Sequence, residues 1–156
     1  MKIDVICVGK LKEKYLVHAV AEYGRRLSRC CQLEIKEVLD EKAPEHLSLK
    51  QEVEIKNKEG QMVLKQIKEG AYVMALAIEG KMYTSKGLAQ QLMKLEGNDK
   101  SHIAFIIGGS LGLSDEVLKR ADELVSFSKM TFPHQLARVI LLEQIARCFA
   151  INKRII

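Results

Sequence analysis

Two loops in this sequence of 156 residues have the composition of a ligand site. One is residues 108–112, Gly-Gly-Ser-Leu-Gly, and the other is residues 126–134, Ser-Phe-Ser-Lys-Met-Thr-Phe-Pro-His. Each follows an apolar run that is typical of a strand and precedes a helical pattern. Because α/β proteins hold ligands at the carboxyl ends of their strands, we expect these two loops to form the ligand site.

The glycine loop permits three interpretations. Two glycines at a strand end let a small ligand approach the backbone. The loop also matches the Gly-x-Ser-x-Gly pattern of hydrolases, with Asp122 and His134 following Ser110 in the required order. Against a hydrolase, the natural helix cap is Ser114, and no HGGG-type oxyanion segment lies upstream. The third interpretation is a tight turn that binds nothing.

His134 and Arg138 are the side chains best placed for chemistry. His134 stands at the expected start of the last helix, and Arg138 follows one turn later. A helix N-terminus lowers the pKa of a histidine, so we expect His134 to be neutral and able to accept a proton. The alternative is a structural histidine that hydrogen-bonds a loop carbonyl. Arg138 is placed to meet a phosphate or a substrate base.

The net charge and the amino-acid composition limit the kinds of partner that the protein can bind. A net charge of +5 suits a polyanion, whereas 5% aromatic residues without Trp argue against a large stacking platform for single-stranded nucleic acid. The expected helix over residues 12–29 carries Lys14, Glu22, Arg25 and Arg29 on one face. That face is either ordinary solvated surface or a surface that touches RNA phosphates.

The sequence contains no recognisable signal peptide and no run long enough to span a membrane. The four cysteines form no CxxC pair, and the histidines lack metal-ligand spacing. We therefore expect a reduced, cytoplasmic protein without a metal site.

Apolar periodicity predicts the elements that position the two loops. Strands are expected over residues 3–8, 33–38, 71–78, 102–107 and 124–127, the second near a sheet edge, with a turn at 79–81. Helices are expected over residues 12–29, 48–68, 85–97, 114–121 and from 133 to the C-terminus. This alternation predicts an α/β fold in one domain over residues 1–156: a mostly parallel sheet with helices on both faces.

The sequence resembles the ribosomal large-subunit methyltransferase H family, which belongs to the SPOUT class. The resemblance extends from residue 1 to about residue 149, and the residues that carry it are 5–14, 40–45, 58–60, 106–112 and above all 127–138. It implies S-adenosylmethionine-dependent N3-methylation of a pseudouridine in 23S ribosomal RNA, within the ribosome. It also implies a homodimer and a trefoil knot near the C-terminus, a topology too rare for periodicity to predict.

The resemblance assigns the family's cofactor contacts to positions in this sequence. This assignment replaces the two other interpretations of the glycine loop, a hydrolase and a turn that binds nothing. From placement beside the cofactor loop, and not from the resemblance, we expect His134, or a group from the partner subunit, to assist proton removal and Arg138 to steady the substrate. The family's S-adenosylmethionine contacts fall on Leu76, Gly108, Phe127, Ser128, Lys129, Met130, Thr131 and Phe132.

The end of the chain departs from the family pattern. Family members typically end in Tyr-His followed by Lys or Arg, whereas residues 151–156 read Ile-Asn-Lys-Arg-Ile-Ile. Ala146 also stands where the family usually has Tyr. We expect the fold and cofactor binding to be retained and turnover to be impaired. The alternative hypothesis is a dimer that binds S-adenosylmethionine and the ribosome without methylating.

Overall fold

The computed structural model describes residues 1–41 and 44–153. Residues 42 and 43 of the motif at 40–45, and residues 154–156 of the atypical ending, lie outside the described part. The strands are β1 (Lys2–Val8), β2 (Gln32–Val38), β3 (Tyr72–Met82), β4 (His102–Ile107) and β5 (Glu123–Ser126). The helices are α1 (Lys14–Leu27), α2 (Leu49–Gln66), α3 (Ser85–Gly97), α4 (Asp115–Arg120) and α5 (His134–Ile151).

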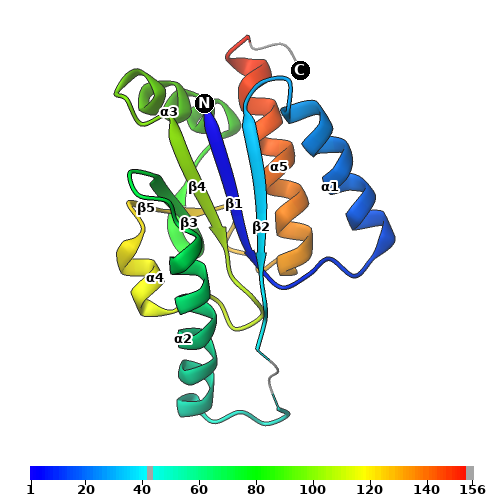
Figure 1. Cartoon of the computed structure of the whole chain (residues 1–156), viewed down its shortest axis with the longest axis vertical. Coiled ribbons are helices and arrows are strands. Elements are labelled where there is room, and N and C mark those ends of the chain that lie inside the picture. Colours follow the sequence, from blue (N-terminus) through cyan, green and yellow to red (C-terminus); the bar gives the residue numbers. More distant parts are fainter. Residues whose placement is uncertain (42–43, 154–156) are drawn as a thin grey trace.

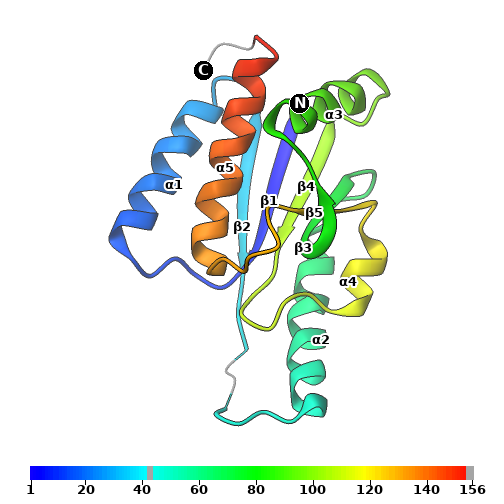
Figure 2. The same ribbon diagram turned by 180° about the vertical axis from the view of Figure 1, so that it is seen from behind.

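The strands form one five-stranded sheet in the order β2-β1-β4-β3-β5, and every neighbouring pair is parallel (Figure 1). Helices α1, α3 and α5 pack on one face, and α2 and α4 cover the other, as the two opposite views show (Figures 1 and 2). Alternate residues of β1 supply the two cores: Val5 belongs to one and Ile6 to the other. The predicted α/β fold with helices on both faces is therefore confirmed, and β2 lies at the edge as expected.

Local signals fix where several helices begin. Ser48 and Gln51 form the capping box that opens α2, and the Ser114 hydroxyl accepts a hydrogen bond from the backbone N–H of Val117 at the start of α4. The cap of α3 is Thr84, whose hydroxyl accepts a hydrogen bond from the backbone N–H of Gly87. No helix in the described part is long and apolar enough to cross a membrane.

The predicted turn at residues 79–81 is wrong, because β3 continues through it to Met82. Both Leu76 and Lys81 of β3 pair with Val125 of β5, so the register shifts between these two contacts. A Cβ atom on Gly80 would lie 2.6 Å from the backbone nitrogen of Val125. Gly80 therefore allows the backbones of two strands to approach closely, whereas the sequence pattern had predicted a turn at this position.

Candidate functional site

A cavity of about 880 Å³ opens beside the middle of β3 and the carboxyl ends of β4 and β5. Its volume falls in the range of about 300–1,000 Å³ that is typical of small-molecule sites. Residues 76–79 in the middle of β3, residues 107–113 around the glycine loop and the segment 125–134 supply most of its wall. Both loops that the sequence selected thus border one cavity.

The glycine loop is a tight turn that leaves its backbone beside the cavity. The Gly112 N–H donates a hydrogen bond to the Gly109 carbonyl at 3.0 Å, and Gly112 has a φ of 86°. A Cβ on Gly108 would lie 3.0 Å from the carbonyl carbon of Gly112 and from Cδ2 of Leu113. A larger residue at position 108 would therefore push this wall of the cavity out of place.

Side-chain hydrogen bonds within the second loop hold its shape. The hydroxyl of Ser126 donates to the carbonyl of Ser128 at 2.9 Å, and the Ser128 hydroxyl accepts from the N–H of Met130 at 3.0 Å. Phe127 packs against the core shared by α3 and α5. The loop is thus anchored at its start, while the exposed Met130 extends from it.

Most of the residues predicted for the site border this cavity. Lys129 and Arg138 do not line it. Those that do are Leu76, Gly108, Phe127, Ser128, Met130, Thr131, Phe132 and His134.

His134 is half-buried at the cavity wall, and burial lowers the pKa of its imidazole. The positive charge of Arg138 and, more weakly, that of Lys12 lower this pKa further, while Asp40 opposes them. A Cβ on Gly9 would lie 3.8 Å from both the Nε2 atom of His134 and the Cγ atom of Asp40, so both side chains flank Gly9. The main cause of the lowered pKa is thus burial, and not the helix N-terminus that the sequence suggested.

Arg138 is only 1% exposed, and its guanidinium ties α5 to the ends of β1 and β2. Its Nη1 lies 2.5 Å from Oε2 of Glu37, and its Nη2 donates to the carbonyl of Gly9 at 3.0 Å. Its Nε has no hydrogen-bond partner among the residues that the structure describes. These contacts fix the segment next to His134, and Glu37 is a partner that sequence reasoning missed.

Glu59 of α2 is a second residue that periodicity did not single out. It is buried, and its Oε2 accepts a hydrogen bond from the backbone N–H of Glu41 at 3.0 Å. A Cβ on Gly109 would lie 3.5 Å from its Oε1, so the carboxyl lies against the glycine loop. Burial raises its pKa. The hydrogen bond from the Glu41 N–H partly opposes this shift, while the charges of Asp40 and Glu41 add to it. The only signal for it was its place in the family motif at 58–60.

The three residues of the alternative hydrolase triad are not assembled. The carboxylate of Asp122 accepts from the backbone N–H of Val73 at 2.8 Å and pairs with Arg120. Ser110 and His134 both border the cavity, but no hydrogen bond joins them in the described part of the chain.

Burial raises the pKa of the Cys148 thiol to about 12, so this thiol is not a nucleophile near neutral pH. The described residues contain no group of three side chains able to hold a metal ion.

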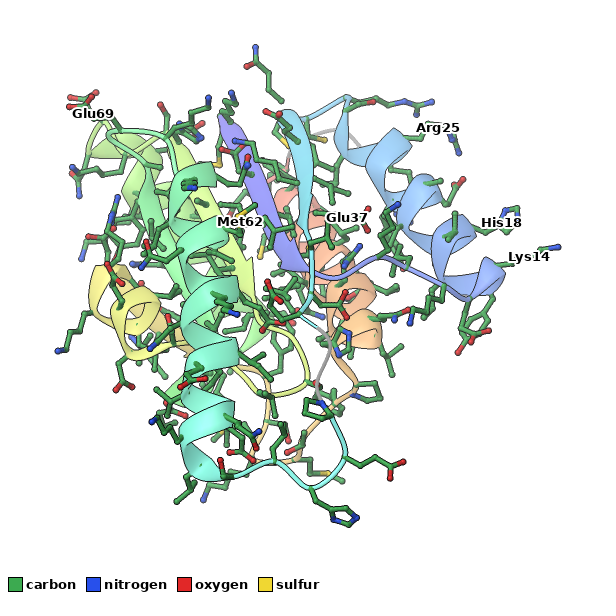
Figure 3. All side chains as sticks on the ribbon, turned by 60° about the horizontal axis from the view of Figure 1, so that its bottom comes forward. Lys14, His18, Arg25, Glu37, Met62 and Glu69 are labelled. Atoms are coloured by element: carbon green, nitrogen blue, oxygen red, sulfur yellow. The ribbon has the colours of Figure 1, made fainter. Side chains whose placement is uncertain are left out.

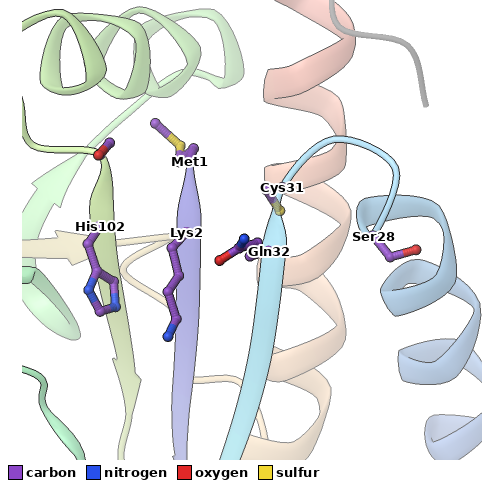
Figure 4. A pocket seen from close by; sticks show the side chains of 7 residues that line it. Met1, Lys2, Ser28, Cys31, Gln32 and His102 are labelled. Atoms are coloured by element: carbon purple, nitrogen blue, oxygen red, sulfur yellow. The ribbon is translucent and has the colours of Figure 1, made fainter.

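A second pocket, of about 410 Å³, lies at the opposite, amino-terminal end of the sheet (Figure 4). It contains none of the predicted site residues and no glycine loop. Its lining consists of Met1, Lys2, Ser28, Cys31, Gln32, Ser101 and His102.

Comparison with known proteins identifies the class to which this fold and cavity belong. The family model described as "Predicted SPOUT methyltransferase" matches residues 1–155, and the chain belongs to this family. The family implies the C-terminal knot that the sequence resemblance predicted.

Within that class, the chain belongs to the ribosomal RNA large subunit methyltransferase H family. Proteins with the name "Ribosomal RNA large subunit methyltransferase H" are 60% identical in Bifidobacterium adolescentis, 59% in Clostridium novyi and 55% in Bifidobacterium animalis subsp. lactis. Each alignment covers 152 residues, which is 97% of this chain and 96% of the relative. The predicted family is therefore confirmed.

Proposed function

We propose that this methyltransferase uses S-adenosylmethionine to methylate N3 of a pseudouridine in 23S ribosomal RNA. It acts on the ribosome in the cytoplasm, as a homodimer of one domain spanning residues 1–156. The observation that carries the proposal is the cavity of about 880 Å³ between the glycine loop and the segment 125–134, with half-buried His134 at its wall.

The cavity residues fit S-adenosylmethionine. Leu76 and Phe127 offer apolar surface for an adenine ring, while the backbone at Gly108 and Ser128 offers polar groups for the ribose and the amino-acid part. The close packing around Gly108 favours a backbone contact over a side-chain contact at that point. When bound, this donor supplies a methyl group that its sulfonium already activates.

Methylation at N3 replaces a proton, so a group at the site has to accept it. A base is effective when it is neutral at the working pH, and the lowered pKa of His134 keeps its imidazole in that form. S-adenosylmethionine would supply the methyl group, and the imidazole of His134 would accept the proton that N3 gives up. The main contribution of the protein is then alignment of donor and acceptor.

Arg138 supports this chemistry by position. Its bonds to Glu37 and to the Gly9 carbonyl hold the segment that flanks His134, and its charge favours the neutral imidazole. In this proposal Arg138 steadies the substrate through the segment at Gly9. Lys129 projects from the same loop as the cavity residues and contributes through its backbone.

Apolar side chains beside the site support the homodimer. Met130 is 72% exposed and Leu136, in the first turn of α5, is 39% exposed. Exposed large apolar side chains next to a site are typical of a surface that a second subunit covers.

The experiment that tests the function uses methyl-labelled donor and ribosomes from a host that lacks this modification. We expect label on N3 of one pseudouridine of 23S ribosomal RNA and donor binding by calorimetry. Donor binding without labelled RNA would favour the alternative, a non-catalytic dimer that binds S-adenosylmethionine and the ribosome.

The impaired turnover expected from the atypical ending is tested with a variant that ends in Tyr-His-Lys. Faster methylation at unchanged donor affinity would support that expectation, and an equal rate would refute it.

A further inference from the structure

The positive charge of this protein is concentrated in one segment. Residues 10–29 contain six Lys or Arg residues and two Glu residues, so they carry four of the five excess positive charges of the chain. Helix α2 is also surface-exposed along much of its length, yet it carries four Lys against three Glu. The excess is therefore a property of the segment around α1 and not of exposed helices in general.

The basic side chains lie on the outward face of α1. Leu16 and Leu27 are its buried residues, and Lys14, His18 and Arg25 project from the opposite side (Figure 3). Spacings of four and seven residues place these three on one face of a helix. The exposed Arg29 follows in the turn after α1. We call Lys14, His18, Arg25 and Arg29 the α1 basic face.

Few of these charges are neutralised within the protein. Arg25 pairs with Glu22 at 2.7 Å, but both side chains are more than half exposed, so the pair is weak. Among residues 1–41 and 44–153, no carboxylate lies within ion-pair distance of Lys14 or Arg29. The face is therefore available to an external anion.

The segment that leads to this face starts at the cavity. The backbone N–H of Lys12 donates to the side-chain oxygen of Gln135 at 3.2 Å, next to His134. The charge of Lys12 also lowers the pKa of His134. A line of positive charge thus extends from the proposed base along α1, whose 14 residues span about 21 Å at 1.5 Å per residue.

We propose that the α1 basic face binds the phosphate backbone of the substrate RNA next to the nucleotide that is methylated. This inference rests on the proposed function and adds the surface that holds the RNA. Lys and Arg without interleaved aromatic rings suit phosphate contacts better than base stacking. The face supplies affinity and orientation, while the cavity selects the nucleotide.

The test compares two triple variants with equal change in charge. The first is Lys14→Gln, Arg25→Gln and Arg29→Gln. The matched control is Lys65→Gln, Lys94→Gln and Lys100→Gln, three exposed lysines that lie outside residues 10–29 and the cavity lining. Affinity for ribosomes lacking the modification, and for protein-free 23S ribosomal RNA, is measured between 50 and 200 mM salt for both. Circular dichroism and calorimetry with S-adenosylmethionine establish that each variant folds and binds the donor.

We expect the basic-face variant to bind ribosomes at least tenfold more weakly at low salt, with unchanged donor affinity. Each phosphate contact contributes about 0.7 to 0.9 to the slope of log affinity against log salt, so the slope should become shallower by about 2 to 3. The control should keep the wild-type slope. A charge-retaining variant, Arg25→Lys with Arg29→Lys, should regain most of the affinity.

Equal slopes for wild type and the basic-face variant would overturn the inference, as would equal losses in both triple variants. Failure of the proposed function has a different signature. If wild type transfers no methyl group but binds 23S ribosomal RNA through this face, the methyltransferase substrate is wrong and the RNA surface stands.

Discussion

A pocket and a histidine lie at each end of the sheet, but the two histidines have different surroundings. At the amino-terminal end, Nε2 of His102 lies 2.7 Å from Oδ2 of the fully buried Asp4, and the Lys36 amine lies 3.5 Å from the same oxygen. At the carboxyl-terminal end, His134 borders the larger cavity, and burial and the charge of Arg138 lower the pKa of its imidazole. Asp4 and His102 at the amino-terminal end contact each other directly, whereas His134 at the other end borders an open cavity.

The buried acids repeat this contrast. Asp4 has two partners, the amine of Lys36 and the imidazole of His102. Glu59, only 6% exposed beside the glycine loop, has no cation within ion-pair distance among the described residues, and its pKa is raised. A charged neighbour, and not complete hydrogen bonding, is therefore what distinguishes the two acids, since Oδ1 of Asp4 and Oε1 of Glu59 both lack a hydrogen-bond partner among the described residues.

Replacing each of the two histidines by alanine should reveal the largest difference between the two ends of the sheet, measured as methylation rate and stability. Loss of a general base lowers a rate by about 10²–10⁴-fold, so His134→Ala should reduce methylation by that order. His102→Ala should leave the rate within about twofold and cost about 1–3 kcal/mol of stability, because the buried Asp4 loses a hydrogen bond. Single-turnover methylation and urea unfolding measure both effects. Full activity in a folded His134→Ala dimer would remove the basis of the comparison.

Neutralising the buried acids should change stability in opposite directions. Asp4→Asn should lower the free energy of unfolding by about 3 kcal/mol, because Lys36 loses its buried partner. Glu59→Gln should raise it slightly at pH values above the raised pKa of Glu59, because burial disfavours the charged carboxylate. The pKa of Glu59 is raised in the folded state, so its proton stabilises the fold below the ordinary value of 4.5, and this stabilisation is lost as pH rises through the raised pKa.

Thermal unfolding between pH 4 and pH 8 checks both acids. The advantage of Glu59→Gln over wild type should increase with pH across this window. An advantage that shrinks with rising pH would show that the neighbours of Glu59 favour its charged form.

Glycine-to-alanine changes should separate the two ends by donor affinity. Gly108→Ala places a Cβ 3.0 Å from the Gly112 backbone, so the glycine loop has to move and donor affinity should drop about tenfold, or 1.4 kcal/mol. Gly97→Ala, at the end of α3, meets no atom within 4 Å and should leave donor affinity unchanged. Calorimetric titration with S-adenosylmethionine distinguishes them, and equal affinities would mean that the loop does not touch the donor.

The smallest expected effect concerns the pH dependence of the rate. Because the pKa of His134 is lowered from 6.5, methylation should lose activity only below pH 6.5, where the imidazole becomes protonated. Lys12→Gln removes one cation that lowers this pKa, so the acid limb of the rate profile should move to slightly higher pH. Lys100→Gln, before β4, is the matched control and should leave the limb in place.

The sequence indicated which loops border the cavity, but it did not indicate the contacts that support them. Glycine and polar loops after apolar strands located the cavity, because parallel strands bring their carboxyl ends to one edge. The partner of Arg138 was not predictable, since Glu37 lies 101 residues away and meets it only when β1, β2 and α5 pack together. Gly80 was read as a turn because glycine signals both turns and close backbone approach, and only tertiary pairing distinguishes these.

The strand order has a consequence for how the chain reaches this structure. β1 lies between β2 and β4, and its residue Lys2 is paired with His102, which is encoded two-thirds of the way along the chain. Such distant parallel pairings require a large loss of chain entropy before any hydrogen bond forms, so folding is slow compared with helical proteins of this size. During synthesis the central strand emerges first and stays without its β4 neighbour until much of the chain has been made. Its apolar residues are then exposed to aggregation, and the early packing of α1 and β2 becomes the protection that a growing chain has available.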